Sequence, residues 1–404
     1  MNEQAHPAST SQSNKDETRS QAQPLTSQPK LSLGLPRGHG RSKPGFSSGG
    51  STNGKPPQSQ TAKQRADIAI RSTDNDAMGS RLSAIMQRYI PGDPFTPMLA
   101  SNEASTSATI SRRSPIINIG TYLRSRSIDR LVQNFLIQSD SPKQIISLGA
   151  GSDSRFWRLQ SDPTIKTLSH YFELDFSNLT TAKVARIRRR QELAQGIGQH
   201  PWISEDQACL QTERYSLIAC DLRTLPDDQN AISLLEKQLD TNKETLIIAE
   251  CVLAYLSPHE SNALLSFLGK LLKRPSALCY EMCVAGDDTT IRDAPPSRFG
   301  SVMLSNLQSR SLDMPGARAF STLSSHKDRF QIGLGQSDTN QKGKGFAQTL
   351  KNVWQSIEEE EKQRLSRLEG LDEIEELEIL LAHYAISWYA FDGAEQATFV
   401  STKL

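Results

Sequence analysis

Four successive apolar runs in the chain end in residues that can bind a ligand. The first stops at two glycines and the next three stop at acids: Gly149 with Gly151, then Asp175, Asp221 and Glu250. Glycine lacks a Cβ, so its backbone N–H groups can approach a ligand closely and its φ can be positive. An acid at the tip of a second strand is placed to accept both hydroxyls of a ribose. These residue types in this order predict a site for a nucleotide-like ligand.

Each of these features also has a simpler explanation when it is taken alone. A Gly-x-Gly pair can be an ordinary turn, and an acid after a strand can cap a helix or solubilise the strand end. Four such ends in sequence argue against coincidence. The third glycine of the fuller dinucleotide motif is absent and Arg155 follows instead, which disfavours a redox dinucleotide. The spacing is typical of a class I S-adenosylmethionine-dependent methyltransferase.

The apolar runs themselves predict the strands of one sheet. They occupy residues 145–148, 171–175, 215–221 and 245–250, and a helix-like segment with Phe156 and Trp157 follows the glycines. Strands that alternate with helices form parallel, doubly wound sheets whose ligands bind at the carboxyl ends of the strands. We therefore predict an α/β, Rossmann-like fold, with added helices before and after the sheet that form the substrate pocket.

Composition narrows the class of protein further. The chain has 404 residues with a net charge of +1, so it lacks the basic excess of a dedicated nucleic-acid binder. No apolar stretch approaches the ~20 residues of a membrane span, and the N-terminus is polar. The five cysteines are scattered and lack neighbouring metal ligands, so we expect free buried thiols, no disulfide and no metal. We expect a monomer that binds neither nucleic acid nor membrane, located in the cytoplasm and also in the nucleus.

The chain divides into a tail and one domain. Residues 1–65 are rich in Ser, Gln, Pro and Gly and are predicted to be disordered, whereas residues 66–404 form the methyltransferase domain. A single Arg-Gly-His-Gly-Arg at 37–41 hints at an RNA-binding tail, but a linker is the favoured interpretation. Polar patches at 286–297 and 336–345 are predicted to be surface loops.

Three other patterns have structural explanations. The basic segment 183–190 is expected to be a solvated helix face, with steering of an acidic partner as the alternative. Leucines at helical spacing between 365 and 381 predict amphipathic helices packed on the core. His383 is expected to be a satisfied structural histidine.

Several motifs resemble those of the leucine carboxyl methyltransferases, which methylate the C-terminal leucine of the protein phosphatase 2A catalytic subunit. The resemblance covers roughly residues 67–404. It rests on segments at 117–124, 148–159, 172–176, 220–223 and 248–255, and later on Tyr280-Glu281, 298–300, 306–307, His383-Tyr384 and Trp388. A related family methylates a modified guanosine in transfer RNA but carries a long β-propeller extension. This chain ends at Leu404 without such repeats, which favours the phosphatase-directed branch.

The resemblance implies a role for each site residue. Gly149 would face the methionine end of S-adenosylmethionine, and Asp175 would bind the ribose hydroxyls. Asp221 would accept from the adenine amine while Leu222 packs on its face. Glu250 would face the methionine amino group or the transfer centre. Two arginines complete the set: Arg124 would approach both cofactor and substrate carboxylate, and Arg81 would reach the cofactor carboxylate, a weaker match because Arg88 lies two turns on.

The chemistry of a carboxylate acceptor is consistent with these residues. An α-carboxyl group has a pKa of about 3.3–3.7, so it is already ionised at neutral pH and needs no general base. It must instead be desolvated and aligned, and the planar fork of an arginine grips a carboxylate in two places. Arg124 is the predicted clamp. Tyr255 and Tyr280 are predicted to donate a hydroxyl to the same carboxylate, with plain packed aromatics as the equal alternative.

Two other functions stay open at this point. One is a methyltransferase that acts on a small carboxylic acid or on a modified transfer RNA base. The other is a non-catalytic module that keeps the cofactor fold. The presence of Arg124 together with Asp175, Asp221 and Glu250 argues against a module without activity.

Overall fold

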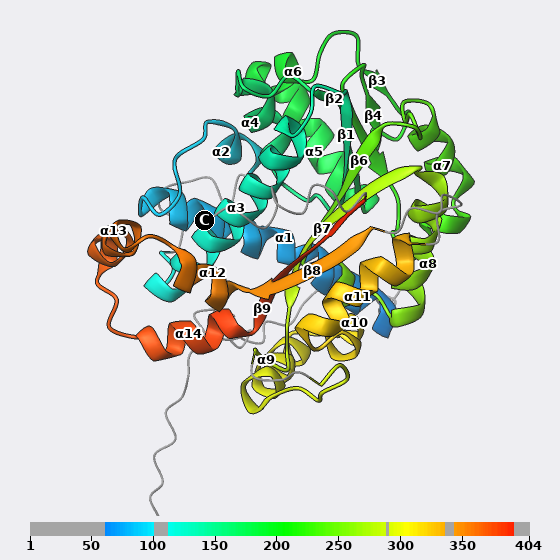
Figure 1. Ribbon diagram of the computed structural model, residues 1–404. Helices are drawn as coiled ribbons and strands as arrows, with labels where there is room; N and C mark the ends of the chain where they lie inside the picture. The colour runs from blue at the N-terminus through cyan, green and yellow to red at the C-terminus, as the bar shows by residue number, and fades with distance from the viewer. Residues whose placement is uncertain (1–60, 101–111, 288–290, 336–342, 392–404) are drawn as a thin grey trace, which may run out of the picture. The chain divides into compact units, whose positions relative to one another are not determined.

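The computed structural model describes residues 61–100, 112–287, 291–335 and 343–391 (Figure 1). Most of the predicted tail, residues 1–60, lies outside the described residues, as do parts of both predicted loops. The first helix, α1 (Ala62–Met86), begins before the predicted domain start at residue 66. It starts there because Thr61 and Gln64 form a capping box, in which each side chain accepts from the backbone N–H of the other.

A mixed, mostly parallel sheet of nine strands forms the centre of the described part of the chain (Figure 1). The strand order is β3-β4-β5-β2-β1-β6-β7-β9-β8. The strands are β1 (Lys143–Leu148), β2 (Leu168–Asp175), β3 (Trp202–Ile203), β4 (Leu210–Gln211), β5 (Tyr215–Ala219), β6 (Glu244–Glu250), β7 (Arg274–Met282), β8 (Lys344–Thr349) and β9 (Tyr384–Ala390).

The five central strands of this order, β5, β2, β1, β6 and β7, run parallel to one another. The strands on either side of them pair in the antiparallel direction. The chain winds from β1 to β2 and β5 in one direction, then returns past β1 to β6 and β7. This reversal beside β1 is the topological switch point where doubly wound sheets bind ligands. The four predicted strands correspond to β1, β2, β5 and β6, so the predicted fold is confirmed.

Helices cover both faces of the sheet (Figure 1). Alternate side chains of one strand enter different cores: Ile145 packs on one face and Ile146 on the other. The first face is covered by α1 and by α2 (Phe95–Leu99), α3 (Pro115–Ile137), α4 (Arg155–Ser161), α5 (Ser177–Arg189), α6 (Gln191–Gly196), α12 (Leu350–Ser356), α13 (Glu359–Glu369) and α14 (Ile374–Ala382). The second is covered by α7 (Gln229–Glu236), α8 (Pro258–Leu271) and α11 (Leu323–Leu334).

A smaller cluster of apolar side chains lies beyond the end of β7. It contains Met282, Val284 and residues of α9 (Arg298–Ser309) and α10 (Pro315–Ala319). Two short 3-10 turns, η1 (Leu225–Asp227) and η2 (Leu253–Tyr255), follow β5 and β6. Gly316 of α10 packs so closely on the backbone of η2 that a Cβ there would meet the carbonyl oxygen of Leu256 at 2.8 Å. This packing helps to fix the segment after β6.

Of the smaller expectations that the described residues test, most are confirmed, with one clear exception. Leu365, Leu377 and Leu381 are buried in the core, as the leucine spacing predicts, although Ile374 is 51% exposed. All five cysteines are free thiols. His383 is buried and satisfied, with Nδ1 on the carbonyl of Ile379 and Nε2 on the Ser297 hydroxyl.

The exception lies in the basic segment that was expected to form a solvated helix face. Arg188, Arg189 and Arg190 are exposed, but Lys183 is buried, because its ammonium pairs with Glu173 at 2.5 Å and donates to the carbonyl of Asp153. No helix in the described residues is both long and apolar enough to cross a membrane.

Candidate active site

The glycine turn between β1 and α4 has the conformation that a close ligand approach requires. Gly149 and Gly151 have φ values of 59° and 48°, which other residues rarely adopt. A Cβ on Gly149 would lie 2.5 Å from Cγ2 of Val252, so the turn is also tightly packed. Substitution of either glycine would therefore both strain the backbone and fill the turn. The predicted order of strand, glycine turn and helix is confirmed, and the contact of Gly149 with the cofactor stays a prediction.

Asp175 ends β2 beside this turn. Its Oδ2 accepts from the N–H of Gly151 and its Oδ1 accepts from the N–H of Phe176, both at 2.7 Å. Burial raises the pKa of Asp175 to about 6, with the nearby Asp74 acting in the same direction, although the two N–H groups oppose this shift. Each oxygen keeps a second lone pair, so the carboxylate can still accept from two ribose hydroxyls.

Asp221 and Leu222 lie just after β5, at the same edge of the sheet. The Asp221 carboxylate is held by Arg223, whose Nη2 and Nε donate to it at 2.6 and 2.8 Å. Burial alone would raise the pKa of Asp221, but the hydrogen bonds and charge of Arg223 lower it below its usual value. Leu222 is buried among apolar side chains. A charged acceptor thus stands next to an apolar side chain, and the adenine-binding role of this pair stays a prediction.

Glu250 ends β6 and is shared by two guanidinium groups. Its Oε2 accepts from Nε of Arg124 at 3.1 Å and lies 3.1 Å from Nη2 of the same arginine, and its Oε1 lies 2.7 Å from Nη2 of Arg155. Arg124 comes from the middle of α3, and its guanidinium lies 4.8 Å from the ring centroid of Tyr280. Among the described residues, Nη1 of Arg124 has no hydrogen-bond partner. The predicted clamp is therefore fixed on one edge and available on the other.

The two predicted tyrosines have different surroundings. Tyr280, in β7, presents its ring to Arg124 and stacks on Tyr384 with 5.5 Å between centroids. Tyr255, at the end of η2, has Thr73 of α1 as a neighbour that influences its hydroxyl, and burial raises the pKa of this hydroxyl. The ring of Tyr280 is thus part of the clamp, while Tyr255 reaches α1.

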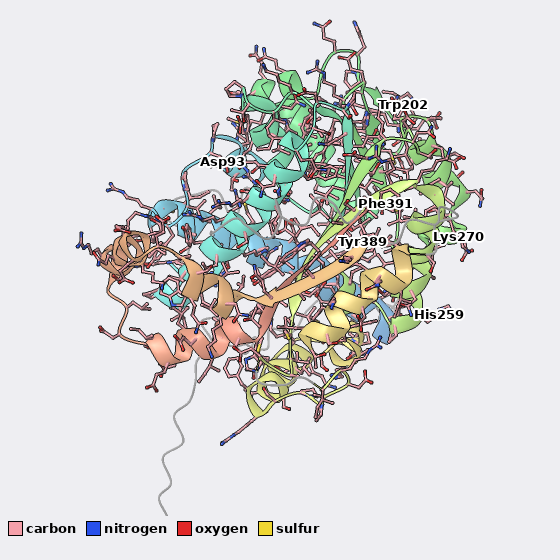
Figure 2. The ribbon with its side chains drawn as sticks, in the orientation of Figure 1. Asp93, Trp202, His259, Lys270, Tyr389 and Phe391 are labelled. Atoms are coloured by element: carbon pink, nitrogen blue, oxygen red, sulfur yellow. The ribbon has the colours of Figure 1, made fainter. Side chains whose placement is uncertain are left out.

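Arg81 of α1 contacts the residue that follows Arg124 in α3. Its Nη1 donates to the hydroxyl of Ser125 at 3.1 Å, and its Nη2 pairs with Asp93 at 3.4 Å. Asp93 lies in the loop before α2 and is labelled in Figure 2. Arg88 is exposed and follows the end of α1 with a φ of 65°. The geometry therefore supports Arg81 over Arg88 as the site arginine.

Helix α1 contacts each part of this edge, and these contacts were not predicted from the sequence. Asp67 pairs with Arg223 at 2.8 Å beside Asp221, and Arg71 lies over the ring of Phe176 beside Asp175. Asp74 accepts from the N–H of Ser152 at 2.7 Å in the glycine turn, and Thr73 meets Tyr255. These partners are 78 to 182 residues apart in sequence, so no local pattern marks them.

A network of arginines and acids behind the glycine turn was also missed. Arg155 and Arg158 of α4 bind Asp129 of α3, and Arg155 also binds Asp153. The Asp153-Ser154-Arg155 sequence directly after the glycines is the one local signal that could have revealed it.

The residues at this edge fit an adenosyl cofactor. Two glycines with positive φ form a cradle that a Cβ would fill, and acids stand at the ends of β2, β5 and β6. The assigned roles of individual residues stay predictions. Fold and site together define the class: an S-adenosylmethionine-dependent methyltransferase. When bound, this cofactor supplies a methyl group on a positively charged sulfur.

Comparison with known proteins defines the family. The family profile described as leucine carboxyl methyltransferase matches residues 69–269. Leucine carboxyl methyltransferase 1 of Mycosarcoma maydis is 35% identical over 407 residues, covering 81% of this chain and 78% of that protein. The chain therefore belongs to the leucine carboxyl methyltransferase family.

Two further relatives carry the same description. Leucine carboxyl methyltransferase 1 of Cryptococcus neoformans var. neoformans serotype D is 39% identical over 352 residues, covering 80% of this chain and 94% of that protein. The protein of that name from Rattus norvegicus is 31% identical over 332 residues, covering 81% of this chain and 92% of its own length. The similarity thus spans nearly the full length of relatives from distant organisms.

Proposed function

We propose that this protein esterifies the α-carboxyl group of the C-terminal leucine of the protein phosphatase 2A catalytic subunit. The methyl group comes from S-adenosylmethionine. One observation carries the proposal: Arg124 is held by Glu250 on one edge and by the ring of Tyr280 on one face, which leaves Nη1 for an incoming carboxylate. A guanidinium fixed in this way is suited to a two-point grip on a planar carboxylate.

The acceptor chemistry needs this grip more than it needs a base. A C-terminal carboxylate is ionised at neutral pH, with a pKa of about 3.3–3.7. It is nevertheless a weak and strongly hydrated nucleophile. Arg124 can displace water molecules from this carboxylate and orient one of its oxygens towards the donor methyl for in-line transfer. The charge on that oxygen and the charge on sulfur both disappear in the transfer, so a site that excludes water favours the reaction.

The direct test is methyl transfer from a radiolabelled cofactor. The purified protein is incubated with the phosphatase catalytic subunit, with the same subunit lacking its last leucine, and with transfer RNA. We expect base-labile label on the intact subunit and none on the truncated subunit. Label on RNA, or equal label on the truncated subunit, would overturn the proposal. A matched Arg124→Ala protein controls for label that arises without the clamp.

A further inference from the structure

Arg155 is a buried arginine near the site, and the proposed chemistry assigns it no role. Its side chain is 3% exposed, and each of its three nitrogens meets a different acid. Nε lies 3.0 Å from Asp129 of α3, Nη1 lies 2.5 Å from Asp153 of the glycine turn, and Nη2 lies 2.7 Å from Glu250 at the end of β6. One side chain thus joins the three elements on which the site is built.

The contact with Glu250 changes how that acid meets the clamp. A carboxylate facing an arginine prefers a two-pronged pair that uses both of its oxygens. Here Arg155 holds Oε1, so Arg124 meets Oε2 alone through Nε and Nη2. Without Arg155, Glu250 would be free to shift along Arg124 until its two oxygens meet Nη1 and Nη2, and it would then occupy the Nη1 donor needed by the acceptor carboxylate.

We propose that Arg155 is a positioning residue for methyl transfer. It restrains Glu250 to a single-oxygen contact with Arg124, and so keeps the outer edge of the Arg124 fork open for the substrate carboxylate. The role in catalysis rests on the proposed function, because it assumes a carboxylate acceptor. The link from Arg155 to Glu250 does not depend on which acceptor is used.

Arg158 provides a matched comparison within the same network. It also binds Asp129, through Nη1 at 2.5 Å and Nη2 at 3.1 Å, but none of its described contacts reaches Glu250. Either arginine therefore keeps Asp129 paired when the other is replaced. Replacing Arg158 removes a guanidinium from the network without releasing Glu250, whereas replacing Arg155 releases it.

The test is a double-mutant cycle with two measurements. Arg155→Gln, Glu250→Gln and the double variant are compared with the wild type, with Arg158→Gln as control. The first measurement is the KM for the phosphatase catalytic subunit. The second is the Kd for S-adenosylhomocysteine, the demethylated product, obtained by calorimetry without any acceptor. Far-ultraviolet circular dichroism melts check that each variant folds, and Arg155→Lys replaces Arg155→Gln if the latter does not.

We expect Arg155→Gln to raise the KM about tenfold or more, since a charged hydrogen bond is lost to the acceptor. We expect its Kd to rise several-fold when Glu250 is intact and by less than twofold when the protein already carries Glu250→Gln. Arg158→Gln should stay within twofold of wild type in both measurements. Equal effects of Arg155→Gln in both backgrounds, or an equal effect of Arg158→Gln, would overturn the inference. Failure of the wild type to label the phosphatase would refute the proposed function instead, and the calorimetric cycle would still decide whether Arg155 acts through Glu250.

Discussion

Several charged residues of the site each form ion pairs with more than one partner. Glu250 pairs with both Arg124 and Arg155, and Arg155 in turn binds two further acids. Pairing of this kind lets several charges stay ionised in a partly buried site, because each has opposite charge within hydrogen-bonding distance. The positions of these charges, more than their presence, then determine which groups are available to a ligand.

The role of Arg124 can be tested by a conservative change. Arg124→Lys keeps the positive charge but loses the planar fork, so the acceptor carboxylate is held at one point. We expect kcat/KM for the phosphatase subunit to fall about 10- to 100-fold, which corresponds to a charged hydrogen bond of about 1.5–3 kcal/mol. Steady-state kinetics with labelled cofactor would measure the change.

Arg126→Lys is a suitable control for this prediction. Arg126 is also on α3, but it pairs with Glu361 and lies over Tyr122, away from Glu250. We expect its kinetics to match those of the wild type. A similar loss in both variants would mean that Arg124 acts through the stability of α3 and does not bind the acceptor.

The raised pKa of Asp175 predicts a pH dependence for cofactor binding. Burial raises this pKa to about 6, and Asp74 and Lys183 are the charged neighbours that act on it in opposite directions. Ribose hydroxyls donate to the ionised form, so binding must compete with protonation below this pH. We expect the Kd for S-adenosylhomocysteine to rise about tenfold for each pH unit below 6 and to be flat above 7. Calorimetry across this range, with Asp175→Asn expected to give a flat profile, would test it; a pH-independent wild type would contradict it.

At the scale of elements, helix α1 and the turn η2 decide how the strand ends are enclosed. α1 contacts the glycine turn through Asp74 and the region after β5 through Asp67. η2 is held at its start by Glu281 of β7, whose Oε1 accepts from the N–H groups of Val252 and Ala254. Asp74 and Glu281 accept from backbone N–H groups that need acceptors at these turns, whereas Asp67 pairs with a guanidinium.

Removal of the Asp74 contact should loosen α1. Asp74 accepts from both the N–H and the hydroxyl of Ser152, and Asp74→Ala abolishes both bonds. We expect faster amide exchange along the first four turns of α1, with the central sheet unchanged. Hydrogen exchange with mass spectrometry would measure this. Asn75→Ala, at the neighbouring exposed position, should leave exchange at the wild-type rate; equal rates in all three proteins would show that Asp74 does not hold the helix.

Glu281 should matter chiefly for stability. It is 1% exposed, and Arg329, the nearest opposite charge, is buried beside it. Glu281→Ala leaves the N–H groups of Val252 and Ala254 without their acceptor, and it removes the negative charge near the buried guanidinium of Arg329. We expect the free energy of unfolding to fall by about 3–5 kcal/mol in urea titrations. Glu236→Ala, at an exposed position, should change it by less than about 0.5 kcal/mol. A small effect at Glu281 would mean that η2 is held by other contacts.

For the chain as a whole, the sheet could be predicted from sequence because its strands carry a local signal. β1, β2, β5 and β6 are apolar runs that each end in glycine or an acid, and doubly wound folds bring such ends to one edge. Asp175, Asp221 and Glu250 therefore reach the same edge by topology alone. The short strands β3 and β4 were missed, because strands of two residues, such as the one with the exposed Trp202 at its start, carry no periodic pattern (Figure 2).

The parts of the site that could not be predicted depend on long-range pairing. Asp67 and Asp74 look like ordinary helix-surface acids until α1 is placed against Arg223 and Ser152. Arg155 likewise has three partners on three elements, and only one of them is near it in sequence. Residues of this kind become identifiable only when the fold has set which elements face each other.

The whole chain should respond to its cofactor as one unit. A ligand that binds only the folded state stabilises it by about 2.7 kcal/mol at a concentration of 100 times its Kd. We expect S-adenosylhomocysteine to raise Tm progressively with concentration, and NAD to leave it unchanged because the third glycine of the dinucleotide motif is missing. Differential scanning fluorimetry would measure both shifts. An equal shift with NAD would contradict the assignment of the site.

The path of α1 along the sheet edge has a kinetic consequence. Its contacts with Arg223, Ser152 and Tyr255 adjoin the predicted adenine, methionine and acceptor positions in turn. We expect these contacts to break when spent cofactor leaves, so that its release limits the rate of repeated cycles. We expect an Asp67→Asn protein to show the same initial burst of product as the wild type, followed by a faster steady phase.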